Sequence, residues 1–357
     1  MKKIIVFAII VILIVGICVG IAYGINAKNK NALTPTFNFM QEGEESKIWV
    51  GTFQLAWNSM LNYLGIEKAE LEGGNTPLVD ELNKKTFTRD ELSEEDYYIA
   101  VGEPTFQFEN KIKEEVKEKF DITETDILDN IMPKSEDEMP MGEQMAMYAL
   151  LNKEFNFLTE FDRLKDNKFK ESEELVKYFG IDMTTDEKVN DNVTVLFYNS
   201  EEEFAVKLNT KENEEVYLYR TNEEKTFDSI YKDMLNKCEK YEGNEKFAER
   251  DLLEIPYINV DESISYDELL NKDIVNKNGF KISSALQDIE FTLNNKGGRV
   301  ISEAEITIEL SLIEPNEEQP RKFIFNNDFC IFLKEKDKEL PYMALKIDNT
   351  DFLVNGE

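Results

Sequence analysis

The residue types that could perform catalysis in this chain are restricted by one absence: none of its 357 residues is histidine. Without histidine, the sequence lacks the Ser-His-Asp and Cys-His nucleophile systems and the commonest zinc ligand sets. Hydrolysis by paired carboxylates stays open, but 73 acidic residues make any one pair uninformative. The pairs Gly73-Gly74 and Gly297-Gly298 fit neither a P-loop nor a dinucleotide fingerprint, and favour turns. We therefore expect a protein that is not an enzyme and binds neither metal nor cofactor.

The segment from Gly298 to Leu312 has the pattern of a β-strand. From Glu303 to Leu312 every second residue is apolar, which is the period of a strand with one wet face. Traced back to Gly298, the same face carries small or slender residues: Gly298, Val300, Ser302 and Ala304. Ile301 is the one residue out of phase. The alternation alone predicts an ordinary sheet strand.

The charge of the chain limits its partners. Its formal net charge is −32 at pH 7. Such a surface repels phosphate backbones and anionic lipid, which argues against nucleic-acid binding and against membrane contact along the acidic part. We interpret the charge as a contribution to solubility.

The N-terminus predicts a membrane segment. No charged residue occurs from Ile4 to Ile25, a run long enough for a helix that crosses a bilayer. We expect a signal anchor over residues 1–28, a tether over 29–45, and a single-pass protein whose domain faces outside the cell. Ala22-Tyr23-Gly24 could serve as a signal-peptidase site, in which case the protein would be secreted.

The rest of the chain reads as one α+β domain over residues 46–357. Helical periodicity predicts helices at 49–64, 110–120 and 226–240, with another beginning at 265–270. Strands are expected at 96–101, 145–157, 193–198, 204–208, 216–219, 252–260, 286–293, 323–333 and 342–347. Pro256 interrupts the strand at 252–260, which predicts a bulge or an edge position there. Whether Cys238 and Cys330 pair is left open by the sequence.

Three motifs near the C-terminus occur in the order of a known family. They are FTLNNKGG at 291–298, FNNDFCIFL at 325–333 after about 26 intervening residues, and PYMALKI at 341–347. This order resembles the C-terminal third of serpins, in which a strand ends in a hinge, an exposed reactive loop follows, and two strands of sheet B close the chain. Upstream, residues 49–64 are similar to a buried serpin helix, 97–120 to a strand and helix, 148–162 to the third strand of sheet A, and 252–274 to a strand followed by a short helix.

The resemblance implies a serpin-like fold, with helices packed around a large central sheet and two smaller sheets. It implies a reactive loop within 298–320 and a hinge formed by Gly297, Gly298, Arg299, Val300, Ser302 and Ala304. By the spacing of the family, the scissile region falls at Leu310, Ser311 and Leu312, an apolar bait suited to chymotrypsin-, elastase- or subtilisin-like pockets. The implied partner is an extracellular serine or cysteine protease with an apolar pocket, and the implied state is a monomer.

The sequence departs from the family at positions that govern sheet opening. Gly51-Thr52-Phe53-Gln54 stands in place of the Ser-Pro-x-Ser shutter motif, Gln287 in place of the shutter histidine, and Phe157 in place of the breach tryptophan. Two functions follow: an inhibitor whose cleaved loop inserts into the central sheet, or a non-inhibitory module for binding or surface structure. A carboxylate glycosidase unrelated to serpins is a third, weaker hypothesis.

Overall fold

The computed structural model describes residues 34–38, 46–122, 143–223, 225–282, 285–299 and 320–356. The expected anchor and tether, residues 1–45, lie largely outside these ranges, as does most of the predicted reactive loop. Within the described residues, no helix is long and apolar enough to cross a membrane. Cys238 is partly buried and Cys330 is buried, and no disulfide joins them.

Four α-helices form in the described chain, at α2 Thr52–Leu64, α3 Pro77–Leu82, α4 Phe106–Phe120 and α6 Phe227–Glu239. Local sequence explains their ends. Thr76, Thr105 and Thr226 cap α3, α4 and α6 by accepting a hydrogen bond from the backbone three residues on. Gly65 ends α2 in the left-handed region, at φ 67°, where a side chain would be strained.

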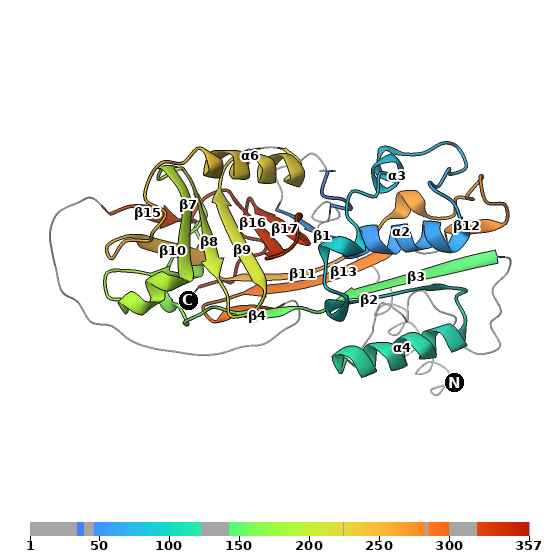
Figure 1. The fold of residues 1–357 in the computed structure, drawn as a ribbon, viewed down its shortest axis with the longest axis horizontal. Helices are drawn as coiled ribbons and strands as arrows, with labels where there is room; N and C mark the ends of the chain where they lie inside the picture. The colour runs from blue at the N-terminus through green and yellow to red at the C-terminus, as the bar shows by residue number, and fades with distance from the viewer. Residues whose placement is uncertain are drawn as a thin grey trace, which may run out of the picture.

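The largest sheet has six strands in the order β1-β17-β16-β9-β8-β7. Every pairing in it is antiparallel. Its strands are β1 Lys47–Val50, β7 Val193–Ser200, β8 Glu203–Asn209, β9 Glu214–Arg220, β16 Phe329–Glu335 and β17 Met343–Ile347. α6 lies over this sheet (Figure 1) and packs Phe227 and Tyr231 against Phe332.

Three further sheets form within the described residues. One follows the order β15-β10-β6-β5, a second β11-β13-β14-β4, and a third, of three strands, β12-β3-β2. Their strands are β2 Tyr97–Gly102, β3 Glu143–Leu151, β4 Glu154–Asn156, β5 Asp162–Lys168, β6 Leu175–Ile181, β10 Leu252–Pro256, β11 Ile258–Ser265, β12 Phe280–Ile282, β13 Leu286–Leu293, β14 Gly297–Arg299 and β15 Lys322–Ile324. Short 3-10 turns occur at Arg89–Glu91, Glu94–Asp96, Glu187–Asn192 and Asp267–Leu269.

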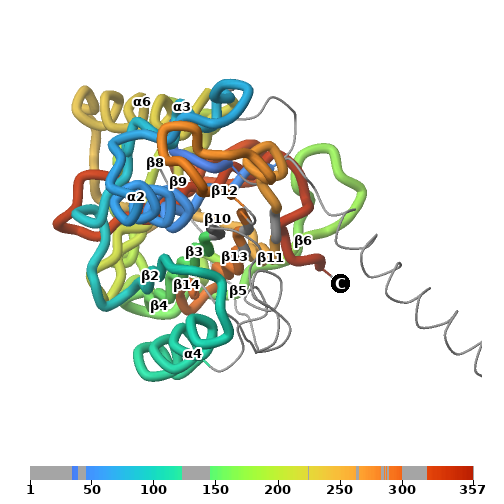
Figure 2. Tube along the Cα trace, turned by 90° about the vertical axis from the view of Figure 1, so that its right-hand side faces the viewer, coloured from blue at the N-terminus to red at the C-terminus, as the bar shows by residue number. Residues whose placement is uncertain are grey.

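Helices α2 and α4 lie on opposite sides of the β2-β3 pair (Figures 1 and 2). Ile112 and Val116 of α4 are buried with Ala146 and Tyr148 of β3. Trp57 and Leu61 of α2 belong to a separate apolar cluster that includes Met145. Both faces of this strand pair are therefore covered.

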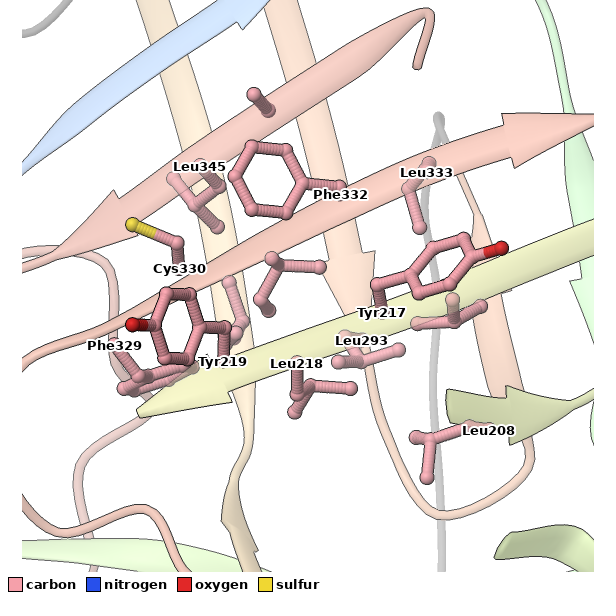
Figure 3. Packing of buried hydrophobic residues seen from close by; sticks show 14 of the residues in the cluster. Leu208, Tyr217, Leu218, Tyr219, Leu293, Phe329, Cys330, Phe332, Leu333 and Leu345 are labelled. Carbon is pink, nitrogen blue, oxygen red and sulfur yellow. The ribbon is translucent and has the colours of Figure 1, made fainter. Parts of the chain in front are cut away.

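The main core covers both faces of the six-stranded sheet, one under α6 and the other against the strands beneath it. Leu293 of β13 joins Leu218 of β9 and Phe332 of β16 in one buried cluster (Figure 3). Aromatic rings fill much of it: the ring centroid of Phe204 lies 5.2 Å from that of Phe323 and 5.0 Å from that of Phe325. Every residue of β16 and β17 is buried, so both faces of these two strands are covered.

Most predicted elements are present, and four expectations were wrong in detail. The strand expected at 145–157 is broken at Asn152-Lys153, and its two parts lie in different sheets. The 323–333 strand divides into β15 and β16, whereas the interruption expected at Pro256 is present and separates β10 from β11. The helix expected at 265–270 is one 3-10 turn. In place of one large central sheet, the described strands form a four-stranded and a three-stranded sheet that share the chain of β3 and β4.

Candidate functional site

The predicted hinge begins as a short strand inserted between two others. Gly297–Arg299 forms β14, which pairs antiparallel with β13 on one side and with β4 on the other. Gly298 lies opposite Leu293 and Phe155, and Arg299 lies opposite Thr292 and Glu154. The chain that leads toward the predicted loop therefore already occupies a strand position within a sheet.

The two glycines of β14 are required by close contacts. A Cβ atom on Gly297 would lie 2.0 Å from the carbonyl oxygen of Phe155, and one on Gly298 would lie 2.4 Å from the Phe155 ring. Both distances are far below van der Waals contact. Any larger residue would push β14 away from β4.

Polar contacts fix the turn between β13 and β14. The backbone N–H groups of Phe157 and Phe161 donate to the carbonyl oxygens of Lys296 and Asn295, at 2.9 and 2.8 Å. The Tyr257 hydroxyl donates to Asn295 Oδ1 at 2.9 Å, and Asn295 Nδ2 donates to Glu160 Oε1 at 2.6 Å. The turn is thus attached to the chain that follows β4.

Phe157, where serpins carry the breach tryptophan, is buried beside this turn. Its ring meets those of Phe155 and Phe161 edge to face, with centroids 6.1 and 4.9 Å apart, and lies 6.3 Å from that of Phe179. Edge-to-face contacts of this kind stabilise beyond the area they bury. Phe157 is therefore in contact with three aromatic rings.

Gln287, where serpins carry the shutter histidine, makes a buried hydrogen-bond network. Its Nε2 donates to Thr52 Oγ1 at 3.2 Å and to the Val50 carbonyl at 3.3 Å. Its Oε1 accepts from the Tyr266 hydroxyl at 2.8 Å. Burial raises the pKa of Tyr266 far above its ordinary value, so the hydroxyl stays a donor. The network joins β13 to the start of α2.

Gln54 is not part of that network. Its Nε2 donates to the Leu82 carbonyl at 2.8 Å and to Asn58 Oδ1 at 2.9 Å, so it connects α2 to the end of α3. Of the substituted shutter positions, the structure therefore brings together Gln287 and Thr52 and leaves Gln54 apart.

Arg321 anchors the chain on the far side of the predicted loop. Its Nε and Nη2 atoms donate to Asp251 Oδ2 at 3.1 and 2.6 Å, and its other donors reach the carbonyls of Asn244 and Lys246 at 2.7 Å. Burial alone would lower the pKa of Arg321, but the adjacent Asp251 carboxylate outweighs it and raises that pKa. The guanidinium holds β15 beside β10. These two strands pair in parallel over three residues.

The other predicted site residues lie outside the described chain. They are the hinge positions Val300, Ser302 and Ala304 and the scissile region Leu310, Ser311 and Leu312. Sequence reasoning also missed three residues: Arg321 after the predicted loop, its partner Asp251, and the buried Lys153 between β3 and β4. Nothing in the local sequence distinguishes them from surface charges.

Comparisons with known proteins bear on the fold alone. No family profile and no curated protein sequence matches the chain. Among solved structures, human thyroxine-binding globulin complexed with thyroxine is similar at 12% identity and a TM-score of 0.48, covering 86% of this chain and 92% of that one. Human glycosylated kallistatin (11% identity, 86% and 92% covered, TM-score 0.49) and Serpin48, a highly specific serpin of the insect Tenebrio molitor (11%, 85% and 92%, 0.45), are similar to a comparable degree.

The order of elements around β14 agrees with the resemblance seen in the sequence. β13 leads into the hinge strand, the predicted loop follows, and β16 and β17 close the chain as neighbours in the six-stranded sheet. The fold is serpin-like in this respect, with several sheets and few helices.

Proposed function

We propose that this chain is a serpin-like inhibitor of an extracellular serine or cysteine protease, held at the cell surface by its N-terminal segment. In this proposal a protease with an apolar pocket cleaves the loop near Ser311, and the loop then extends β14 as a new strand of the sheet. The chain itself is not an enzyme, because the covalent chemistry belongs to the protease.

One observation carries the proposal: β14 already lies between β13 and β4 and leads directly into the predicted loop. Extension of an existing strand avoids the unfavourable nucleation of a new strand between two others. The small residues that follow on the inward face, at positions 300, 302 and 304, are compatible with such burial.

The test is to mix the full chain with subtilisin or chymotrypsin and to look for an adduct that survives SDS. Trypsin serves as the comparison, because Leu310 and Leu312 do not suit its pocket. An adduct with the first two proteases supports the proposal. Cleavage without an adduct by several such proteases would count heavily against it.

A second candidate is a non-inhibitory module that uses the same fold for binding or as a structural surface protein. The network from Gln287 to Thr52 and Tyr266 favours it, because these buried bonds hold β13 to α2 and oppose movement of the sheet. In that case the melting temperature would be unchanged after loop cleavage, because no strand is gained.

A further inference from the structure

Lys153 is a buried lysine in the break between β3 and β4. Its side chain is 5% exposed, and its ammonium lies 2.7 Å from one carboxylate oxygen each of Asp96, Glu214 and Glu335. An ammonium has three hydrogen-bond donors, so these three partners account for all of them. The ammonium also lies over the Tyr342 ring, 5.1 Å from its centroid.

The three carboxylates belong to different parts of the fold. Asp96 directly precedes β2 of the three-stranded sheet. Glu214 opens β9 and Glu335 closes β16, and these two residues lie opposite each other in the six-stranded sheet. Glu335 is fixed in turn by the backbone N–H and hydroxyl of Ser93, at 2.9 and 2.5 Å. Lys153 therefore ties the break to both neighbouring sheets.

The break is also where the chain changes sheet. Beyond Lys153, β4 pairs with β14, and before it, β3 pairs with β2 and β12. The last pair of β14 with β4 joins Arg299 to Glu154. In an antiparallel ladder the next position to be paired is the residue before Glu154, which is Lys153. A strand that grows beyond Arg299 must meet Lys153 first.

We propose that Lys153 is a positioning residue for strand extension, whose three ion pairs hold the first backbone position that a lengthening β14 must pair with. This inference rests on the proposed function, because strand extension is the event that it assists. The ion pairs fix the break relative to β9, β16 and β2, so that the backbone does not have to be ordered during extension. Without these ion pairs, the backbone at the break is no longer held in a fixed position between the two sheets.

The ion pairs of Lys153 must be tested by removing the ammonium and its buried carboxylate partners in one variant. Mutating Lys153 alone would leave three neighbouring carboxylates without their cation, two of them buried, and would strongly destabilise the fold. The triple variant Lys153→Met, Glu214→Gln and Glu335→Gln removes the ammonium together with its two most buried partners, while Asp96, whose side chain is 28% exposed, keeps its charge. A matched control is Lys237→Met, Glu203→Gln and Asp233→Asn, because Lys237 also binds two carboxylates and a tyrosine hydroxyl, but on α6.

The experiment uses the full chain, nicked in the loop with subtilisin, and follows the melting temperature of the nicked and intact forms over time. We expect the gain in melting temperature after nicking to develop roughly tenfold more slowly in the Lys153 variant than in the wild type, with the control unchanged. A purely structural role would lower the melting temperatures of both forms alike and leave the rate of gain as it is. That result would overturn the inference while the proposed function stands.

Hydrogen exchange of the intact protein separates the two hypotheses. If the melting temperature of the wild type does not rise after nicking, the proposed function fails. The role of Lys153 is then decided by the exchange rates of the backbone amides of residues 154–156 and 297–299. Exchange about tenfold faster at these amides in the Lys153 variant, but not in the control, would support positioning of β14. Unchanged exchange there would overturn it.

Discussion

Gln287 Nε2 on β13 donates a hydrogen bond to Thr52 Oγ1 at the start of α2, across 235 residues of sequence. The side chains of both residues are buried. The bond joins the strand next to the hinge to a helix that packs beside β2 and β3. It therefore couples the two sheets that would separate if a strand entered between them.

We expect Gln287→Ala to lower the free energy of unfolding by about 1 to 3 kcal/mol, because it leaves the buried Tyr266 hydroxyl without its acceptor. Thr52→Val should cost less, since Gln287 Nε2 keeps the Val50 carbonyl. Chemical denaturation of the intact protein checks both values. Equal losses for the two variants would contradict this account of the network.

Gly297→Ala should displace β14. The added methyl group would overlap the Phe155 carbonyl oxygen, which is backbone and cannot rotate away. Overpacking of this kind costs about 1 to 3 kcal/mol, and expulsion of three residues from the sheet is the alternative. Hydrogen exchange at residues 154–156 should rise in the variant.

Arg299→Ala is the control for Gly297→Ala, because Arg299 is in the same strand and its side chain is 43% exposed. We expect little change in exchange there. If Arg299→Ala opens β14 as much as Gly297→Ala does, the close approach of the glycine is not what holds the strand.

Arg321→Ala should release β15 from the edge of its sheet. The variant leaves the Asp251 carboxylate, 4% exposed, without its cation, and an unpaired buried charge costs about 3 kcal/mol or more. Hydrogen exchange at residues 322–324 measures the release. Arg321→Lys should restore only part of the protection, because lysine has no planar fork to hold Asp251 with two donors.

An Arg321→Ala/Asp251→Asn double variant separates the two causes. It removes the buried charge as well, so its loss of stability should be smaller than that of Arg321→Ala alone. A greater loss of stability in the double variant than in Arg321→Ala would mean that the unpaired charge of Asp251 is not what destabilises the single variant.

Local patterns explain what the sequence could predict. The periodicity of Trp57, Met60 and Leu64 gave α2, and the alternation within 193–219 gave β7, β8 and β9, because these patterns depend on neighbours along the chain. Motif order placed the hinge at Gly297 and Gly298, which form β14.

Long-range pairing explains what the sequence did not predict. The insertion of β14 depends on Phe155, more than 140 residues earlier, and the break at Lys153 depends on Glu214 and Glu335. A lysine between Asn152 and Glu154 has the composition of a surface turn. Only the fold shows that its ammonium is buried among carboxylates.

Glu214 predicts a pH dependence of stability. Its side chain is 4% exposed, and burial raises its pKa above the ordinary range, although the ammonium of Lys153 and the Tyr342 hydroxyl oppose that rise. The negative charge of Glu335 raises the pKa of Glu214 further. Glu335 itself has a lowered pKa, because the hydrogen bonds from Lys153 and Ser93 outweigh its burial.

The two carboxyl groups act on stability in opposite directions. A carboxyl group whose folded pKa is raised stabilises the fold fully below its unfolded pKa, and this contribution is lost as the pH rises through the folded pKa. Glu214 should therefore favour the folded state under mild acid and disfavour it at neutral pH. Glu335 stabilises above the unfolded pKa and loses that contribution as the pH falls through its folded pKa.

Glu214→Gln should remove the contribution of Glu214 to the pH dependence of stability and leave that of Glu335. We expect the melting temperature of the wild type, relative to this variant, to fall as the pH rises from about 4.5 toward 7.5. Glu335→Gln should lose most stability relative to the wild type at neutral pH, and less as the pH falls below about 4. Thermal melts of the three proteins across this range measure both trends. If the melting temperature of the wild type instead rises relative to that of Glu214→Gln as the pH rises, the attraction of Lys153 outweighs the effect of burial on the pKa of Glu214. The ionised form of Glu214 would then stabilise the fold.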